Sequence, residues 1–446
     1  MLASDVFKAY DVRGIYPDEL DEAGAEAIGR AYVERFEPRR IAVGRDMRLS
    51  SPAMQEAVMR GAARAGADVL DLGLVGTEMV YFAVGSLELE GGIMVTASHN
   101  PKQYTGLKLV RRGALPVGGD SGLLDLRDLI EAGNWHVTDR GEVHDVDIWP
   151  EYVARVLSFV DVDVIKPLRV VIDAANGMAG TMLPPVLQRL PIDAVRCYFE
   201  PDGSFPNHEP NPLLPENREF IVRKTLEEGA DLGVAFDGDG DRCFFVDETG
   251  EFVPGDFATA LFAESVLAKE PGAKIIYDVR ASRAVPDTID RAGRVPLVNR
   301  VGHAFIEARM RKEDASFAGE VSGHYYFRDF SQADSGVVPF LLMLELISKR
   351  GRLSEILAPL RTRYFITGEL NTPVADVALK LQELKERYAA EGGRISHLDG
   401  ISVDFDDWHF NVRPSNTEPL LRLNLEAMSE ELMKQKRDEV LGVIRS

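Results

Sequence analysis

Cysteine and long apolar runs are scarce in this chain of 446 residues, and basic residues are too few to balance the acidic ones. Acidic residues outnumber basic ones by 72 to 51, which gives a formal net charge of −21 and argues against nucleic acid and anionic membranes as partners. No apolar run approaches the length needed to cross a bilayer, and no basic region followed by an apolar core opens the chain. These absences predict a cytoplasmic protein.

The chain has only two cysteines, Cys197 and Cys243, whose spacing fits neither a metal site nor a disulfide framework. No Walker phosphate-binding loop is present. What remains is an ordinary globular composition, 45% hydrophobic and 28% charged, with a length that suits about three or four domains. A small fold stabilised by disulfide bonds is therefore excluded, and any catalytic or binding groups have to come from other motifs.

An internal repeat organises most of the chain. Three segments begin with a strand that runs into a loop and then a helix, at 41–46, 170–177 and 274–280. Each unit ends with a further strand that leads into a polar loop, at 93–100, 232–242 and 316–324. The last part of the chain alternates apolar and polar residues as antiparallel strands do. We therefore predict an α/β fold of three similar mixed-sheet domains (1–149, 150–254 and 255–360) and a smaller C-terminal α+β domain (361–446), arranged around a central cleft.

The first of these polar loops contains Ser98. The apolar run 93–95 is long enough for a buried strand, and Asn100-Pro101 then turns the chain, so Ser98 sits where ligands bind in open α/β sheets. Its hydroxyl can act as a nucleophile or carry a covalent phosphate, although a turn rich in Ser, Thr and Asn is also an ordinary structural feature. Lys108 follows on a strand that could return its ammonium beside the hydroxyl.

The second polar loop is acidic and is the most specific feature of the sequence. Asp237, Asp239 and Asp241 alternate with glycines, so their carboxylates point to one side, repel one another and favour a hard divalent cation, Mg²⁺ first. A calcium-binding EF-hand loop also has acidic residues at these spacings. It is excluded because Arg242 stands where that loop needs glycine, and because strands rather than helices flank the motif.

Two further loops carry groups suited to a sugar phosphate. Glu320 and Ser322 point the same way in an extended segment, which suits vicinal sugar hydroxyls, and His324 can transfer protons near neutral pH. The segment 413–417 offers a guanidinium, two hydroxyls, an amide and turn N–H groups, as a phosphate-binding loop would. Taken alone, each of these loops is also compatible with a purely structural turn.

Together, the four loops resemble those of the α-D-phosphohexomutase superfamily, and the resemblance covers essentially the whole chain in the same order. The segment 96–101 looks like the family's phosphoserine loop, 237–242 like its metal loop, 319–324 like its sugar-binding loop and 413–419 like its phosphate-binding loop. Val321, at the variable position of the sugar loop, looks most like the bacterial-type phosphomannomutase/phosphoglucomutase branch, because phosphoglucosamine mutases usually carry glutamine there.

The resemblance implies an isomerase that interconverts hexose 1-phosphate and hexose 6-phosphate, of mannose or glucose. Phosphorylated Ser98 would donate its phosphoryl group, form a hexose 1,6-bisphosphate and take back the other phosphate. The implied residues fall into four sets: a magnesium site of Ser98, Asp237, Asp239 and Asp241; catalytic Lys108, His324, Arg242, Arg13 and His303; sugar-binding Glu320, Ser322, Arg280 and Tyr10; and phosphate-binding Arg413, Ser415, Asn416 and Thr417.

Two departures from the family pattern leave the sugar preference open. Arg280 stands where many members have lysine, and Ser335 stands where Asp-Asp-Gly is common. A phosphoglucosamine mutase and a metal-dependent sugar phosphatase stay as alternatives. A non-catalytic sugar-phosphate sensor is disfavoured because it should have lost Ser98 or one of the aspartates. The expected partners are small sugar phosphates, and either a monomer or a homodimer is compatible with the sequence.

Overall fold

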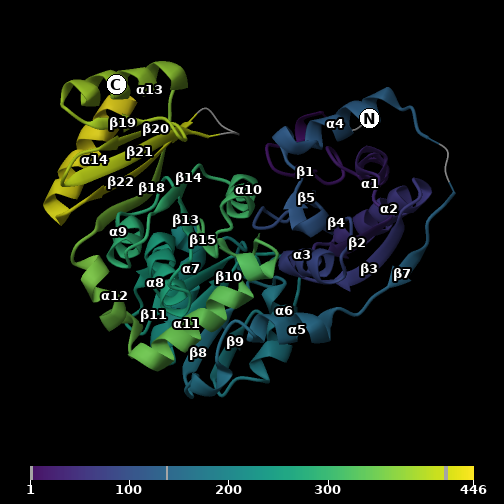
Figure 1. Cartoon of the computed structure of the whole chain (residues 1–446), viewed down its shortest axis with the longest axis horizontal. Helices are drawn as coiled ribbons and strands as arrows, with labels where there is room; N and C mark the ends of the chain where they lie inside the picture. Colours follow the sequence, from purple (N-terminus) through teal and green to yellow (C-terminus); the bar gives the residue numbers. More distant parts are fainter. Residues whose placement is uncertain (1–3, 137–138, 416–419) are drawn as a thin grey trace. The chain divides into compact units, whose positions relative to one another are not determined.

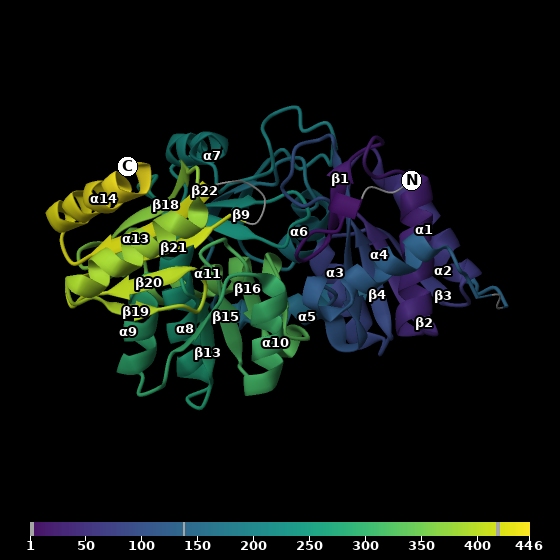
Figure 2. The same cartoon turned by 90° about the horizontal axis from the view of Figure 1, so that it is seen from above.

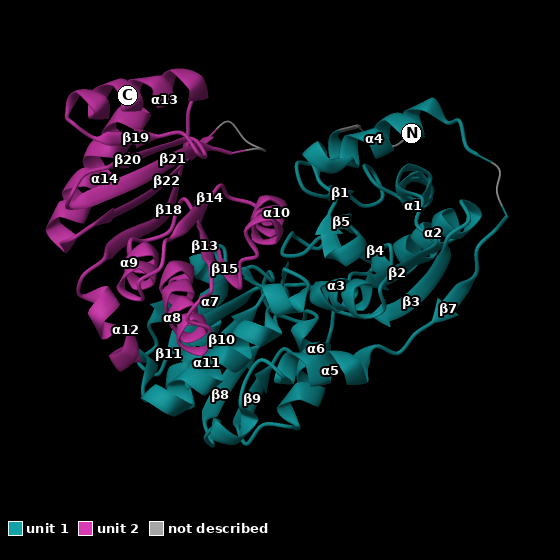
Figure 3. Ribbon diagram, in the orientation of Figure 1, with its two compact units in different colours: residues 1–253, 322–353 teal, residues 254–321, 354–446 magenta. Residues whose placement is uncertain are grey.

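The computed structural model describes residues 4–136, 139–415 and 420–446. It divides into two compact units, one formed by residues 1–253 with 322–353 and the other by 254–321 with 354–446 (Figure 3). Across the described residues, every helix is too short or too polar to span a lipid bilayer. Short 3₁₀ helices occur at Ser4–Val6, Arg112–Ala114, Gly119–Ser121, Val162–Val164 and Arg328–Phe330.

The first unit begins with a sheet of order β1-β5-β4-β2-β3-β7, in which β6 pairs with β5. Its strands are β1 (Val12–Ile15), β2 (Arg40–Arg45), β3 (Asp68–Leu74), β4 (Gly91–Val95), β5 (Tyr104–Arg111), β6 (Leu115–Pro116) and β7 (Val143–Asp145). Four helices accompany it: α1 (Glu22–Phe36), α2 (Ser51–Arg64), α3 (Thr77–Ser86) and α4 (Leu123–Ala132). Helices α1 and α2 pack against each other beside the strands (Figure 1), and β4 is buried along its whole length, as its apolar sequence predicts.

A second sheet, of order β12-β11-β10-β8-β9, completes most of this unit. Its strands are β8 (Arg169–Asp173), β9 (Asp193–Cys197), β10 (Leu232–Phe236), β11 (Cys243–Asp247) and β12 (Phe252–Val253), and its helices are α5 (Trp149–Leu157), α6 (Ala179–Leu187) and α7 (Pro215–Glu227). Strands β10 and β11 are antiparallel and wholly buried, so they hold both ends of the acidic loop. The unit also contains β16 (Tyr325–Phe327), β17 (Ala333–Asp334) and α11 (Val337–Arg350).

The second unit contains β13 (Ile275–Asp278), β14 (Leu297–Asn299) and β15 (Phe317–Gly319), with α8 (Gly255–Lys269), α9 (Ala284–Arg291), α10 (His303–Glu313) and most of α12 (Leu353–Arg361). The predicted repeat is confirmed by the strand pairing. Strand β2 lies parallel between β3 and β4, β8 between β9 and β10, and β13 between β14 and β15.

The end of the chain forms the expected smaller α+β region, with an antiparallel sheet of order β18-β22-β21-β20-β19. Its strands are β18 (Phe365–Pro373), β19 (Arg394–Ser396), β20 (Ile401–Asp404), β21 (Trp408–Pro414) and β22 (Leu420–Ala427). Helices α13 (Val377–Ala390) and α14 (Glu430–Arg445) lie side by side over the sheet (Figure 2). Apolar and polar residues alternate along β21 and β22. The apolar side chains form the core between the sheet and its helices, and the polar ones lie on the other face of the sheet.

A buried carboxylate from α3 joins two parts of the first unit. Glu78 accepts hydrogen bonds from the Tyr152 hydroxyl at 2.6 Å and the Ser335 hydroxyl at 2.9 Å, and from the backbone N–H of Gly336 at 2.6 Å. It thereby binds the N-terminus of α11, where a negative charge is favourable. The departure at Ser335 belongs to this network, because an aspartate there would place a second carboxylate against Glu78.

The pH dependence of stability should report on Glu78. Burial raises the pKa of this carboxyl from 4.5 to about 7, although its hydrogen bonds oppose the shift. Because the folded protein holds the proton more tightly, the stabilisation is complete below pH 4.5 and is lost as the pH rises through about 7, with a total of about 3 kcal/mol. Between pH 5 and 8 the melting temperature of the wild type should therefore fall more than that of Glu78→Gln. The control Glu56→Gln, on the exposed side of α2, should follow the wild type, and equal pH slopes for wild type and Glu78→Gln would contradict the assignment.

Candidate active site

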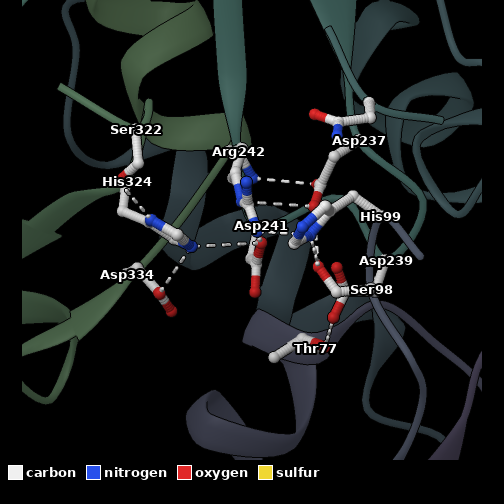
Figure 4. A network of polar contacts seen from close by, with 12 residues as sticks. Thr77, Ser98, His99, Asp237, Asp239, Asp241, Arg242, Ser322, His324 and Asp334 are labelled. Carbon is white, nitrogen blue, oxygen red and sulfur yellow. Dashed lines mark hydrogen bonds and ion pairs between the residues drawn. The ribbon is translucent and has the colours of Figure 1, made fainter. Parts of the chain in front are cut away.

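Ser98 follows β4 on a loop whose backbone it helps to shape. Its φ is 49°, in the left-handed region that costs an L-residue about 1–2 kcal/mol, and its N–H donates to the Thr96 hydroxyl at 2.8 Å. The Ser98 side chain is buried. Its hydroxyl lies 3.0 Å from a carboxylate oxygen of Asp237 and 3.2 Å from Nδ1 of His99 (Figure 4). The serine loop and the acidic loop therefore meet at this hydroxyl, as a metal-assisted phosphoserine site requires.

The acidic loop can approach this closely because it contains glycine. A Cβ atom at Gly238 would lie 2.4 Å from the carbonyl oxygen of Ser98, and Gly240 has a φ of 78°. Asp237, Asp239 and Asp241 are all buried, and one carboxylate oxygen from each falls within 4.8 Å of the other two. Three acids this close together are a strong concentration of negative charge.

The Lys108 ammonium compensates part of this charge. Its position on β5 brings Nζ to 2.7 Å from Asp239 and 2.5 Å from Asp241, both hydrogen-bonded contacts. Burial opposes the charge on Lys108, but the two carboxylates outweigh it and raise its pKa well above the usual value. Conversely, burial would raise the pKa of Asp239, but the nearby Lys108 ammonium lowers it. The pair is therefore ionised, and the predicted strand return delivers the lysine to the acidic loop.

Asp237 differs from Asp239 and Asp241 in that Lys108 does not donate a hydrogen bond to it. Burial raises its pKa well above the ordinary range, and the carboxylates of Asp241 and Asp239 add to the shift. Among the described residues, the buried Oδ1 atoms of Asp239 and Asp241 accept no hydrogen bond. A carboxylate cluster with uncompensated buried oxygens fits a hard divalent cation with oxygen ligands. The residues present are therefore suited to a divalent metal ion.

Arg242 and His99 also lie close to Ser98 and Asp237. One guanidinium nitrogen of Arg242 lies 2.5 Å from Nδ1 of His99, and its Nε lies 3.5 Å from Asp237. Burial lowers the pKa of His99 well below its usual value, and the positive charges of Arg242 and Arg13 lower it further, so the ring is neutral. Because Arg242 donates to Nδ1, the proton of the neutral ring belongs on Nε2. The sequence reasoning quoted His99 within its motif but did not assign it to the site.

His324 and Ser322 belong to the same network (Figure 4). The Ser322 hydroxyl lies 3.0 Å from Nδ1 of His324, and Nε2 lies 3.8 Å from Asp241 and 4.0 Å from Asp334. His324 therefore lies beside the acidic loop, as expected for a group that transfers protons there. Asp334 was quoted in the sequence only as part of a departure from the family pattern.

Of the remaining predicted residues in the first unit, Arg13 reaches the serine loop. Its guanidinium contacts the side chains of Asp11 and Asn100, which places it against the segment that carries Ser98. Tyr10 is partly buried two residues before β1. Nothing in their positions conflicts with the roles that the resemblance implies.

In the second unit, Arg280 lies two residues after β13, and its side chain is 7% exposed. It donates two hydrogen bonds to the Asp278 carboxylate, both at 2.9 Å, and lies 3.8 Å from Glu320. Lysine could not form this two-pronged contact, which gives the departure at this position a physical meaning. Glu320 also accepts a hydrogen bond from the N–H of Gly302 at 3.0 Å, directly before His303 opens α10. The structure therefore brings Arg280, Glu320 and the start of α10 together.

A carboxylate that sequence reasoning missed lies among three arginines of the second unit. Glu369 on β18 lies 2.9 Å from Arg413, 2.8 Å from Arg422 and 3.6 Å from Arg280. Burial would raise its pKa, but these arginines hold it at about 2. Arg422 also lies 3.3 Å from the Ser415 hydroxyl, whereas Asn416 and Thr417 lie outside the described residues. Arg422 pairs with Arg413 across the sheet, and since no local sequence pattern specifies this register, the sequence offered no signal for the cluster.

Comparison with known proteins agrees with this geometry. Models of the phosphoglucomutase/phosphomannomutase family match alpha/beta/alpha domain I at residues 4–132, domain II at 150–250, domain III at 254–364 and the C-terminal domain at 369–443. The phosphomannomutase of Salmonella montevideo is 44% identical over 99% of both chains. The phosphohexose mutases protein of Xanthomonas campestris pv. campestris is 43% identical over 98% of this chain and 99% of its own. A crystal structure of a phosphoglucomutase/phosphomannomutase family protein from Burkholderia thailandensis superimposes with a TM-score of 0.92 at 33% identity, covering 100% of this chain and 98% of that one. The chain therefore belongs to the phosphoglucomutase/phosphomannomutase family of the α-D-phosphohexomutase superfamily.

Proposed function

We propose that this chain is a phosphohexose mutase that interconverts hexose 1-phosphate and hexose 6-phosphate through a phosphoserine at Ser98. Its full-length relatives named phosphomannomutase and phosphohexose mutases support an isomerase of this kind. The observation that carries the proposal is the 3.0 Å approach of the Ser98 hydroxyl to a carboxylate of the acidic cluster. A hydroxyl in this position can carry a phosphoryl group beside a bound cation.

The acidic cluster supplies the cation site of this proposal. Asp237, Asp239 and Asp241, with an oxygen of the phosphoryl group on Ser98, would hold Mg²⁺. When bound, Mg²⁺ neutralises negative charge on the phosphoryl group and thereby favours its transfer. Lys108 is already ionised at the same carboxylates, so it adds a fixed positive charge next to the phosphoryl group.

The reaction consists of two transfers that mirror each other. In the first, the bond between phosphorus and the Ser98 oxygen breaks as a bond forms to the C6 hydroxyl oxygen of hexose 1-phosphate; the C6 hydroxyl proton passes to a base, and the Ser98 oxygen takes up a proton. In the second, Ser98 gives that proton to a base and takes the C1 phosphoryl group of the bisphosphate; the bond between phosphorus and the C1 oxygen breaks, and that oxygen takes up a proton as hexose 6-phosphate is released. The two candidates for proton transfer are His324, whose Nε2 lies 3.8 Å from Asp241 and could accept the proton, and the ionised Lys108, which could donate one to the leaving oxygen. Arg13, Arg242 and His303 are assigned to the lining of the site.

The remaining predicted residues would bind the substrate. Glu320, Ser322, Arg280 and Tyr10 are assigned to the sugar, and Arg413, Ser415, Asn416 and Thr417 to the phosphate that does not react. Arg422 joins the second set because it lies beside Ser415. The activator and intermediate would be a hexose 1,6-bisphosphate. The domain limits at 149, 254 and 360, a cytoplasmic location and a monomeric or homodimeric state belong to the same proposal.

The proposal is tested by incubating the purified protein with glucose 1-phosphate, Mg²⁺ and a trace of glucose 1,6-bisphosphate. We expect glucose 6-phosphate to appear, and intact-mass analysis to show partial phosphorylation that maps to Ser98. Parallel assays with mannose 1-phosphate and glucosamine 1-phosphate assign the sugar and decide the phosphoglucosamine alternative. Release of inorganic phosphate with no isomerisation and no label at Ser98 would show a phosphatase instead.

A further inference from the structure

The side chain of Arg48, which the assignments above do not use, forms hydrogen bonds to the backbone of the serine loop. Arg48 lies in the loop after β2, and its side chain is fully buried. One terminal nitrogen donates to the carbonyl oxygens of Ser98 at 2.8 Å and Asn100 at 2.6 Å. The other donates to the carbonyls of Pro101 at 2.9 Å and Tyr104 at 3.1 Å. The four terminal N–H groups of one guanidinium thus gather four carbonyls of the loop.

The guanidinium is itself held rigidly. Asp46 lies 3.3 Å from its Nε and also accepts the backbone N–H of Arg48 at 2.9 Å. From the other direction, the Phe205 ring centre lies 5.2 Å from the guanidinium carbon, within cation–π range. A Cβ atom at Gly203 would come within 2.6 Å of the Arg48 Cα, so the 203–205 segment packs directly on this loop. The buried guanidinium is therefore contacted both by a carboxylate and by an aromatic ring.

This arrangement explains how Ser98 keeps a backbone conformation that is unfavourable in isolation. With φ at 49°, the residue requires external contacts to stay in the left-handed region. Arg48 turns the Ser98 carbonyl inward, and the hydroxyl is on the side that faces Asp237. Displacing this carbonyl would displace the hydroxyl from the acidic cluster, and a misplacement of about 1 Å typically lowers a rate by about 10²-fold.

We infer that Arg48 is the positioning residue of the phosphoryl-transfer step, which fixes the Ser98 hydroxyl or its phosphoryl group against the acidic cluster without touching the substrate. The inference rests on the proposed phosphoserine function. It predicts an effect on kcat, because the loop geometry governs phosphoryl transfer. It predicts little effect on KM, because Arg48 is not among the residues assigned to the sugar or to the phosphate that does not react. Lysine cannot replace it, because a single ammonium cannot donate to four spread carbonyls.

The test compares Arg48→Lys with Phe205→Leu, which removes the ring on the other side of the same guanidinium but no hydrogen bond to the loop. After both variants and the wild type are loaded with glucose 1,6-bisphosphate, ³¹P NMR reports the phosphoserine signal directly. In Arg48→Lys we expect kcat to fall by about 10²-fold, KM to stay within about threefold, and the phosphoserine resonance to shift or broaden. Phe205→Leu should lose thermal stability but keep the wild-type resonance and a kcat within about threefold. If Arg48→Lys folds poorly, kcat, KM and the phosphoserine resonance are measured on Arg48→Met at a lower temperature.

The outcomes separate the two proposals. A wild type with neither mutase activity nor a phosphoserine signal refutes the phosphoserine function. A normal wild type together with an Arg48→Lys variant of unchanged kcat and resonance refutes the role of Arg48 alone. Equal losses of kcat in Arg48→Lys and Phe205→Leu, in proportion to their melting temperatures, would also overturn it by showing a purely structural contribution.

Discussion

The Ser98→Ala variant is expected to lose mutase activity by at least about 10³-fold, because it lacks the hydroxyl that would carry the phosphoryl group against Asp237. Its affinity for glucose 1-phosphate, measured by titration calorimetry, should change by no more than about threefold, since the Ser98 oxygen is not among the groups assigned to the sugar or the distant phosphate. Intact mass after treatment with glucose 1,6-bisphosphate should show no added phosphate.

A companion variant makes this experiment independent of folding defects. Glycine accepts the φ of 49° more readily than alanine, so Ser98→Gly should be more stable than Ser98→Ala by about 1 kcal/mol while being equally inactive. Ser86→Ala, on the exposed end of α3, is the matched control and should retain full activity and the phosphorylated mass. A fully active Ser98→Ala enzyme would rule out the phosphoserine route.

The second large effect concerns Asp237, for which stability and activity should change in opposite directions. Without metal, this buried carboxylate is repelled by Asp241 and Asp239, and burial with this repulsion raises its pKa well above the ordinary range. A raised carboxyl pKa means that stability is lost as the pH rises, so the ionised group is unfavourable at pH 8. In EDTA at that pH, Asp237→Asn should therefore melt at a higher temperature than the wild type.

In Mg²⁺ the order should reverse. The wild type gains a bound ion that stabilises the folded state, whereas Asp237→Asn has lost a ligand and should show little or no rise in melting temperature. Mutase activity of the variant should fall by about 10²–10⁴-fold, as for the loss of a cation that neutralises phosphoryl charge. Asp18→Asn, at an exposed position, should match the wild type in every condition. A wild type whose melting temperature ignores both EDTA and Mg²⁺ would contradict the metal site.

Local sequence patterns were sufficient to predict the elements that surround the chemistry. The apolar run before Ser98 becomes a wholly buried strand, and the strands on both sides of the acidic loop are equally buried. The repeat was visible because each unit reuses the same order of strands, loops and helices. The serine and acidic loops both follow the carboxyl ends of such strands, but these strands belong to different sheets, so their meeting depends on how the two sheets pack.

What the sequence did not reveal depends on contacts between distant segments. Arg48 acts on carbonyls about fifty positions away, and backbone acceptors leave no signature in the residue types of the loop that supplies them. Glu78 meets Ser335 only in the folded chain. Glu369 approaches Arg422 through the register of β18 and β22, which no local pattern specifies. From the sequence alone, charged residues of this kind cannot be distinguished from solvent-exposed surface residues.

The carboxylate of Glu369 has a consequence for any anion that approaches Arg413. Three neighbouring guanidiniums would ordinarily repel one another. The Glu369 carboxylate offsets this repulsion and keeps Arg280, Arg413 and Arg422 close together before an anion binds. An incoming oxyanion therefore meets arginines that are already assembled. Since Glu369 continues to share those arginines, they would hold an incoming anion less tightly than unpaired guanidiniums would, which favours its release.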